Sequence, residues 1–123
     1  MRKILVTAFV LIAPMSALHA QSMPVSQFLG KAEALEKKGM RALFSSDIGV
    51  LKAEVMNSGK QLRAEQEAAL KAGRKPATCL PKKAQMNSNE LLAYLRAIPP
   101  AQRNMPIKAA FAGLMRKKYP CPA

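Results

Sequence analysis

Apolar residues recur along most of this chain at intervals of three, four and seven, the spacing that places them on one face of an α-helix. The pattern covers residues 24–44, 48–73, 88–98 and 106–119. No segment alternates apolar and polar residues in the way that a half-buried strand does. The sequence therefore predicts an all-α fold, a small four-helix bundle that forms a single domain.

Residues that cap helices mark three of the predicted starts. The cluster at residues 45–47 (Ser-Ser-Asp) precedes the second helix, and Asn87 or Ser88 precedes the third. Short polar side chains at these positions accept hydrogen bonds from free backbone N–H groups. Glu90 is placed to complete a capping box with Asn87. Pro106 is expected to begin the last helix, in the first turn, where its missing N–H is harmless.

Glycines predict where two of the helices end or weaken. Gly39 is expected to end the first helix, after which Met40, Leu43 and Phe44 continue its apolar face for another turn. Residues 57–59 (Asn-Ser-Gly) lie in the middle of the second helix, where a glycine costs about 1 kcal/mol relative to alanine. We expect that helix to bend or break there.

The first twenty residues have the order and length of a secretory signal peptide. Arg2 and Lys3 precede an apolar run at residues 4–13, and Leu18-His19-Ala20 resembles a cleavage site. The apolar run is too short to span about 30 Å of hydrocarbon. We therefore expect removal of residues 1–20, no transmembrane segment in the mature chain, and a single periplasmic domain of residues 21–123.

Cys79 and Cys121 are the only cysteines, and both lie in the predicted mature chain. Two cysteines in an exported domain of this size most often form one disulfide. The alternative, a reactive thiol, needs a neighbouring base or a lowered pKa, and the sequence shows no such partner. The bond would close a loop of 43 residues and stabilise the thin core of a small bundle by about 4 kcal/mol.

The sequence offers no catalytic, cofactor-binding or metal-binding residues, and we expect a protein that is not an enzyme. The only histidine, His19, lies in the signal peptide, which excludes Ser-His and Cys-His catalysis and imidazole ligands in the mature chain. The methionines are scattered rather than clustered as copper ligands. Glu33 and Glu36 share a helix face, but surface ion pairs with Lys37 and Lys38 explain them better than a carboxylate pair for hydrolysis.

Positive charge is concentrated in the second half of the chain. Residues 21–70 carry a net charge of +1, whereas residues 71–123 carry +10. The bases gather in two clusters, Lys71, Arg74, Lys75, Lys82 and Lys83 near one cysteine and Arg116, Lys117 and Lys118 near the other. A disulfide would bring the two clusters together. They form either a site for an acidic partner or a solvated face. Nucleic acid is the weakest candidate, because the protein is exported and offers no aromatic platform.

A series of motifs between the two cysteines resembles a known family. Cys79-Leu80-Pro81 precedes a helix containing Leu91-Leu92-Ala93-Tyr94-Leu95-Arg96, followed by Pro99-Pro100-Ala101-Gln102-Arg103. An Ala- and Leu-rich segment then ends at Tyr119-Pro120-Cys121. This order is similar to the Rap/Tai family of periplasmic immunity proteins. The resemblance covers about 43 residues. Members often carry another cysteine pair in the N-terminal half, which residues 21–78 lack.

The resemblance implies a small helical protein that binds and neutralises a peptidoglycan amidase delivered by type VI secretion. Such a protein does no chemistry and covers the active site of its target. The resemblance also implies that Cys79 and Cys121 form the structural disulfide. Arginine and tyrosine are common in binding hot spots. We therefore select the partner-binding residues Arg74, Lys75, Arg103 and Tyr119, which flank the predicted disulfide.

Two points remain open at this level. A cationic envelope protein that binds anionic lipid or cell-wall polymer through the basic half is the alternative to an immunity protein, and the two differ in salt dependence. A leucine and methionine stripe on the second helix is compatible with a homodimer interface, although packing in the core is the default explanation for it.

Overall fold

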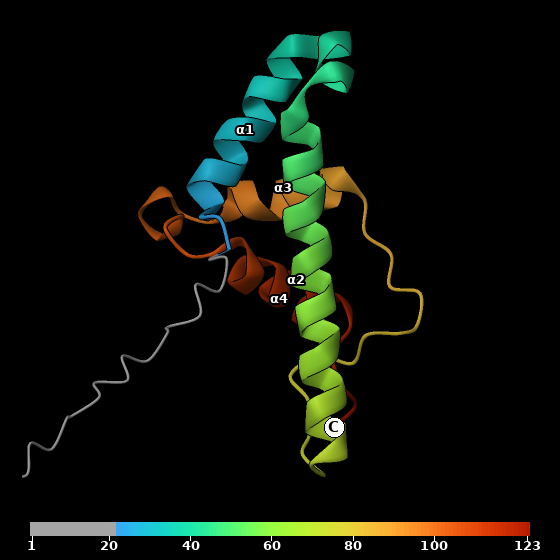
Figure 1. Ribbon diagram of the computed structural model, residues 1–123. Coiled ribbons are helices and arrows are strands. Elements are labelled where there is room, and N and C mark those ends of the chain that lie inside the picture. Colours follow the sequence, from blue (N-terminus) through green and yellow to red (C-terminus); the bar gives the residue numbers. More distant parts are fainter. Residues whose placement is uncertain (1–21) are drawn as a thin grey trace, which may run out of the picture.

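The computed structural model describes residues 22–123, so the predicted signal peptide at residues 1–20 lies outside the described part of the chain. It contains the α-helices α1 (Val25–Lys38), α2 (Ser46–Lys71), α3 (Ser88–Ala97) and α4 (Ile107–Lys118), and the short 3-10 helices η1 (Gly39–Phe44) and η2 (Pro100–Gln102). The predicted all-α class, with four packed helices and one disulfide, is confirmed. α1 and the first half of α2 form a hairpin, while α3 and α4 cross behind α2 (Figure 1).

All four helices contribute to one hydrophobic core, but they do so unequally. Val25, Leu95, Ile107 and Met115 are the largest fully buried side chains. They come from α1, α3 and α4, whereas Leu62 is the single buried hydrophobic residue of α2. The 26-residue helix α2 therefore lies along the outside of the core, and every member of the core belongs to residues 23–115.

A proline stands directly before α1 and another directly before α4. Pro24 and Pro106 occupy the N-cap positions, where neither offers a side-chain hydrogen bond to the helix that follows. The sequence predicts Pro106 in the first turn of the last helix, but in the structure it directly precedes that helix. The first N–H groups of a helix need acceptors from outside it. The two prolines pair in an isolated antiparallel bridge, which supplies those acceptors.

The two helix starts cap each other through this bridge. The N–H of Val25 at the start of α1 donates to the carbonyl of Met105, at 2.9 Å. The N–H of Ile107 at the start of α4 donates to the carbonyl of Met23, at 2.8 Å. Each N-terminus is therefore satisfied by the residues that precede the other helix.

Helix α2 is tied to the same junction by one carboxylate. Glu54 accepts hydrogen bonds from the backbone N–H of Met23, at 3.2 Å, and from the hydroxyl of Ser22, at 3.4 Å. The hydroxyl oxygen of Ser22 also accepts from the N–H of Lys108 in the first turn of α4, at 3.0 Å. The segment before α1 therefore joins three helices.

α2 runs without interruption through residues 57–59, so the predicted break does not occur. The hydroxyl of Ser58 donates to the carbonyl of Glu54 one turn earlier, which satisfies this buried polar side chain inside the helix. Gly59 faces α4, where an added Cβ would lie 3.9 Å from the ring of Phe111. Packing against α4 thus compensates for the low helix propensity of this glycine.

The segment after α1 also differs from the sequence prediction. Gly39 has a φ of +56° and turns the chain out of α1, and residues 39–44 form η1. Met40, Leu43 and Phe44 therefore do not continue the buried face of α1. All three side chains are exposed to solvent at the tip of the hairpin.

The predicted caps of α2 and α3 form as single hydrogen bonds. The hydroxyl of Ser45 accepts from the N–H of Asp47, and the side-chain carbonyl of Asn87 accepts from the N–H of Glu90. The carboxylate of Glu90 bonds Lys118 of α4 instead of completing the capping box. The first turn of α3 is therefore fixed to α4.

None of the helices between residues 22 and 123 is both long enough and apolar enough to cross a lipid bilayer.

The mutual capping of α1 and α4 predicts unusual protection from hydrogen exchange. We expect the amides of Val25 and Ile107 to exchange with the slow rates of core amides, because each donates to a carbonyl of the opposing segment. The amides of Ser88 and Asn89, exposed residues that open α3, should exchange much faster. Hydrogen exchange followed by NMR measures both pairs. Equal, fast exchange at all four amides would contradict the bridge.

Candidate functional site

The disulfide between Cys79 and Cys121 joins the loop after α2 to the C-terminal segment after α4, with the two Cα atoms 4.9 Å apart. Around it, the N–H of Cys79 donates to the carbonyl of Tyr119, at 3.0 Å. The hydroxyl of Tyr119 accepts from the N–H of Gln85 and donates to its carbonyl. The predicted disulfide is confirmed, and the two segments that carry the basic clusters lie side by side.

Two side chains of α2 hold the same loop from the other side. The amide group of Gln66 accepts from the N–H of Leu80, at 2.7 Å, and donates to its carbonyl, at 3.3 Å. The guanidinium of Arg63 donates to the carbonyl of Pro81, at 2.9 Å. The loop is therefore fixed between α2 and the C-terminal segment, although it contains no regular secondary structure.

Of the four residues that the sequence suggests for partner binding, Arg103 lies apart from Tyr119. Arg74 and Lys75 are exposed at the start of the loop. Arg103 lies before α4 and Tyr119 after it, and this 12-residue helix is about 18 Å long. The guanidinium of Arg103 donates to the carbonyls of Arg96 and Ile98, at 2.9 Å each. Arg103 thus caps the C-terminus of α3, and Tyr119 anchors the loop.

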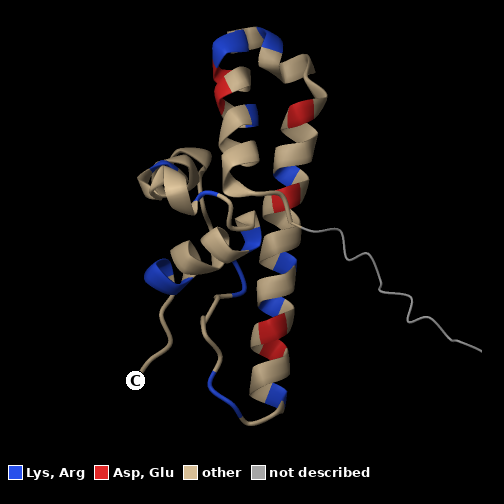
Figure 2. Ribbon diagram, turned by 90° about the vertical axis from the view of Figure 1, so that its left-hand side faces the viewer, with Lys and Arg blue, Asp and Glu red and all other residues tan. Residues whose placement is uncertain are grey.

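Exposed bases gather around the disulfide and form a surface that we name the basic end. Its seven exposed members are Lys71, Arg74, Lys75, Lys82, Lys83, Arg116 and Lys117. Figure 2 shows these bases on the lower end of α2, along the loop and at the end of α4. None of the seven takes part in the ion pairs found among residues 22–123.

Three acidic side chains form ion pairs away from the basic end. Glu36 pairs with Arg96, which links α1 to α3, and Asp47 pairs with Lys31 within the hairpin. Glu65 of α2 pairs with Lys108 of α4. Glu90 pairs with Lys118 next to the basic end, but none of the seven bases of the basic end forms an ion pair among the described residues. Their positive charge is therefore not neutralised by a direct ion pair.

A second candidate site is an open groove of about 510 Å³ between α1, α2 and α3. Buried side chains of the core, among them Phe28 and Leu91, form its floor. Only two charged residues, Glu36 and Lys52, line it. The other large apolar side chains that line the groove are partly or fully exposed, namely Leu35, Ile48, Leu51, Val55, Met56, Met86 and Leu92. We name this surface the apolar groove.

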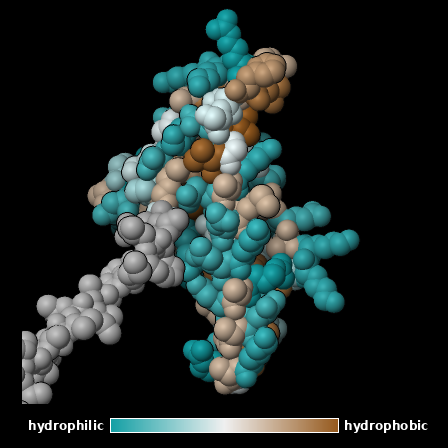
Figure 3. Space-filling view, in the orientation of Figure 1, coloured by the Kyte–Doolittle hydropathy of each residue, from teal (hydrophilic) through white to brown (hydrophobic). Residues whose placement is uncertain are grey.

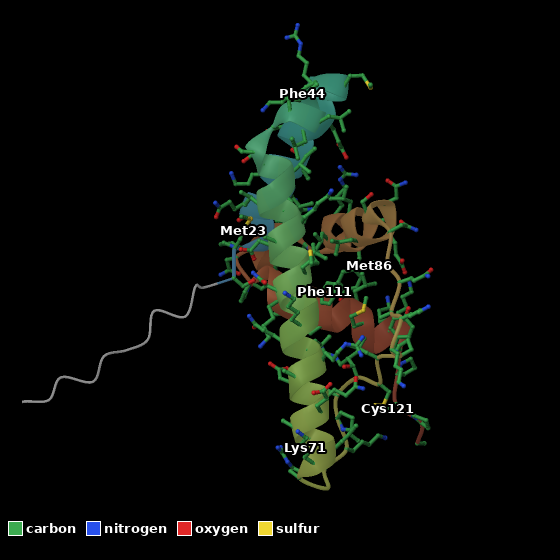
Figure 4. All side chains as sticks on the ribbon, turned by 45° about the vertical axis from the view of Figure 1, so that its right-hand side comes forward. Met23, Phe44, Lys71, Met86, Phe111 and Cys121 are labelled. Atoms are coloured by element: carbon green, nitrogen blue, oxygen red, sulfur yellow. A yellow bond between two sulfur atoms is a disulfide. The ribbon has the colours of Figure 1, made fainter. Side chains whose placement is uncertain are left out.

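The helical periodicity of the sequence does not reveal the apolar groove. Ile48, Leu51 and Val55 share the apolar face of α2, but each of these side chains is only half-buried. The first half of α2 pairs with α1 in the hairpin, and α3 crosses behind it (Figure 1), so the side chains of α2 between the two helices are only partly covered. Figure 4 shows Met86 coming from the loop toward this region. The sequence signal for the groove was that the second helix has more apolar positions than a small core can bury.

The described residues 22–123 contain no group of three or more His, Cys, Asp or Glu side chains that could hold a metal ion. No protein-family model, no curated protein and no solved structure matches the chain.

We expect Tyr119 to act as a structural anchor. Tyr119→Phe removes both hydrogen bonds to Gln85 and should lower the free energy of unfolding by about 0.5–1.5 kcal/mol. Tyr94→Phe is the matched control, because it removes a hydroxyl of the same kind on α3 and should have a smaller effect. Thermal denaturation of the two variants makes the comparison. An unchanged melting temperature for Tyr119→Phe would contradict the structural role.

Proposed function

We propose that this protein is a non-catalytic binding protein that acts in the periplasm and neutralises a protein partner by covering part of its surface. The observation that carries the proposal is the apolar groove. Apolar side chains on a rigid support are unfavourable in water, and patches of this kind commonly mark contacts with other proteins. The partner surface that fits best is the apolar face of a helix, the mode in which an amphipathic segment lies in a groove.

The lining of the apolar groove supports a protein contact. The carboxylate of Glu36 already bonds Arg96, so Lys52 is left as the one charged lining residue without an ion pair among residues 22–123. A helix with an apolar face and an acidic residue at its edge would satisfy both features. The disulfide supports the compartment, because such bonds persist in oxidising environments.

The partner that we propose is a peptidoglycan amidase delivered by type VI secretion. This proposal rests on the resemblance to the Rap/Tai immunity proteins between Cys79 and Cys121. Within that segment, Leu91 and Leu92 belong to the lining of the apolar groove. The segment that carries the resemblance therefore forms part of the apolar groove.

The test is a pull-down with tagged residues 21–123 from a periplasmic extract, washed at high salt, followed by an inhibition assay. We expect one peptidoglycan amidase to remain bound and to lose its activity when the two proteins are equimolar. Recovery of material that leaves in the high-salt wash, or of a protein whose activity is unchanged, would contradict the immunity function.

Met56→Glu tests whether the apolar groove is the contact. Met56 lines the groove and its side chain is 60% exposed, so the change places a charge at the interface without disturbing the core. We expect the affinity for the amidase to fall by tenfold or more, since a buried unpaired charge costs over about 1.4 kcal/mol. The matched control is Leu70→Glu, on the same helix and 58% exposed, but outside the groove. Calorimetric titration measures both. Equal affinities for the two variants would place the contact elsewhere.

A second candidate function is specifically favoured by the basic end. Seven exposed bases with no carboxylate paired to them are suited to a hydrated polyanion, such as an anionic cell-wall polymer. Of the large exposed apolar side chains, Leu70 is the one next to these bases in the sequence. This composition favours binding by charge over insertion into an apolar phase.

The charge-based function predicts strong salt dependence. The variant with Arg74, Lys75, Lys82 and Lys83 changed to Gln should elute from an immobilised polyanion such as heparin at clearly lower salt. The matched control changes Lys37, Lys38, Arg41 and Lys52 to Gln, removing the same number of charges far from the disulfide. Both variants lose the same net charge, so equal elution would show that only net charge matters and would contradict a site at the basic end.

A further inference from the structure

The end of the hairpin opposite the basic end carries an exposed apolar cluster. Met40, Leu43 and Phe44 are 80%, 68% and 92% exposed. They belong to η1, the turn between α1 and α2, and we name this surface the apolar tip. Figure 4 shows Phe44 at the extreme end of the hairpin, and Figure 3 shows hydrophobic side chains there beside hydrophilic ones.

The backbone explains why these side chains cannot return to the core. Gly39, at a φ of +56°, ends α1, and Ser45 caps α2 only six residues later. The intervening 3-10 turn lies at the far end of the hairpin, beyond the region where α3 and α4 cross (Figure 1). The buried residues of α1 end at Ala32, so the last turn of α1 is also outside the core.

The apolar tip is accompanied by positive charge. Residues 37–46 contain three bases and no acid. Lys37, Lys38 and Arg41 are all exposed, and none takes part in an ion pair among the described residues. Figure 2 shows these bases at the top of the hairpin. Bases around a few large apolar side chains are the composition that binds at the interface of an anionic bilayer.

We propose that the apolar tip docks onto an anionic phospholipid bilayer, with Leu43 and Phe44 entering the headgroup region and Lys37, Lys38 and Arg41 contacting lipid phosphates. The tip projects from the fold, so it can enter a lipid surface without rearrangement of the helices. A second copy of the chain fits less well, because pairing two tips would bring two sets of three uncompensated bases together. The inference goes beyond the proposed function, since it concerns neither the apolar groove nor the basic end.

A single-tryptophan reporter tests this docking. The chain contains no tryptophan, so Phe44→Trp places the only indole at the tip. We expect its emission to shift to shorter wavelength when vesicles of phosphatidylglycerol and phosphatidylethanolamine are added, and to change little with phosphatidylcholine vesicles. The matched control is Leu70→Trp, an exposed position at the other end of α2, whose emission should stay that of a solvated indole. An unshifted Phe44→Trp emission, or equal shifts for the two reporters, would overturn the proposal.

Paired variants separate the apolar and electrostatic contributions. Changing Leu43 and Phe44 to Ser should lower vesicle binding by about tenfold or more, whereas changing Leu70 to Ser should leave it nearly unchanged. Changing Lys37, Lys38 and Arg41 to Gln should reduce binding by roughly fivefold for each base. The same number of Gln substitutions at Arg74, Lys75 and Lys82 should leave the shift of the Phe44→Trp reporter in place.

The apolar run at residues 4–13 could bind lipid itself, so the measurement is made on residues 22–123 and repeated on the full chain. Residues 22–123 contain the whole core, which supports their folding as a unit. Sedimentation without vesicles tests whether a second copy of the chain binds the apolar tip. A concentration-dependent dimer that is lost when Leu43 and Phe44 become Ser would assign the tip to a second copy of the chain and overturn lipid docking.

Discussion

The fold depends on the reciprocal capping of two helices that begin with proline. α1 and α4 lie far apart in the sequence, yet the residues before each supply the acceptors that the first turn of the other requires. Because Pro24 and Pro106 have no side-chain hydrogen bond to offer, neither helix start is satisfied on its own. Glu54 extends the junction to α2. Once these groups are paired, the directions of α1, α2 and α4 are fixed together, and the core closes around the buried side chains of α1 and α4.

α2 connects this junction to two surfaces that differ in chemistry. Its first half forms a hairpin with α1 that carries the apolar tip and, together with α3, the apolar groove. Its second half holds the loop after residue 72 through Gln66 and Arg63, and the disulfide fixes that loop to the end of α4. The molecule thus has an apolar region and a basic region at opposite ends of one long helix. This separation allows the protein contact, the polyanion contact and the lipid contact to be tested independently.

Sequence reasoning was accurate where local patterns or covalent chemistry decide the outcome. Helical periodicity placed the four helices, and the side chains of Ser45 and Asn87 cap α2 and α3. It did not reveal contacts between residues that are distant in the sequence. Residues 57–59 predict a break in the second helix, but Gly59 lies against Phe111 of α4. Arg103 and Tyr119, which the sequence suggests for partner binding, also have a structural role that the sequence did not indicate, because they donate to α3 and bond the loop. Their part in partner binding stays a prediction.

The sequence by itself determined the all-α class, the two cysteines that pair and the excess of positive charge in the second half of the chain. These follow from spacing, count and composition, which do not depend on how the helices pack. Only the tertiary structure decided which apolar residues are exposed. Leu43 and Phe44 have the same periodicity as core residues, yet α3 and α4 cross too far from the tip to cover them. A small core cannot bury both halves of a 26-residue helix, so the first half of α2 lines the apolar groove and the turn before it forms the apolar tip.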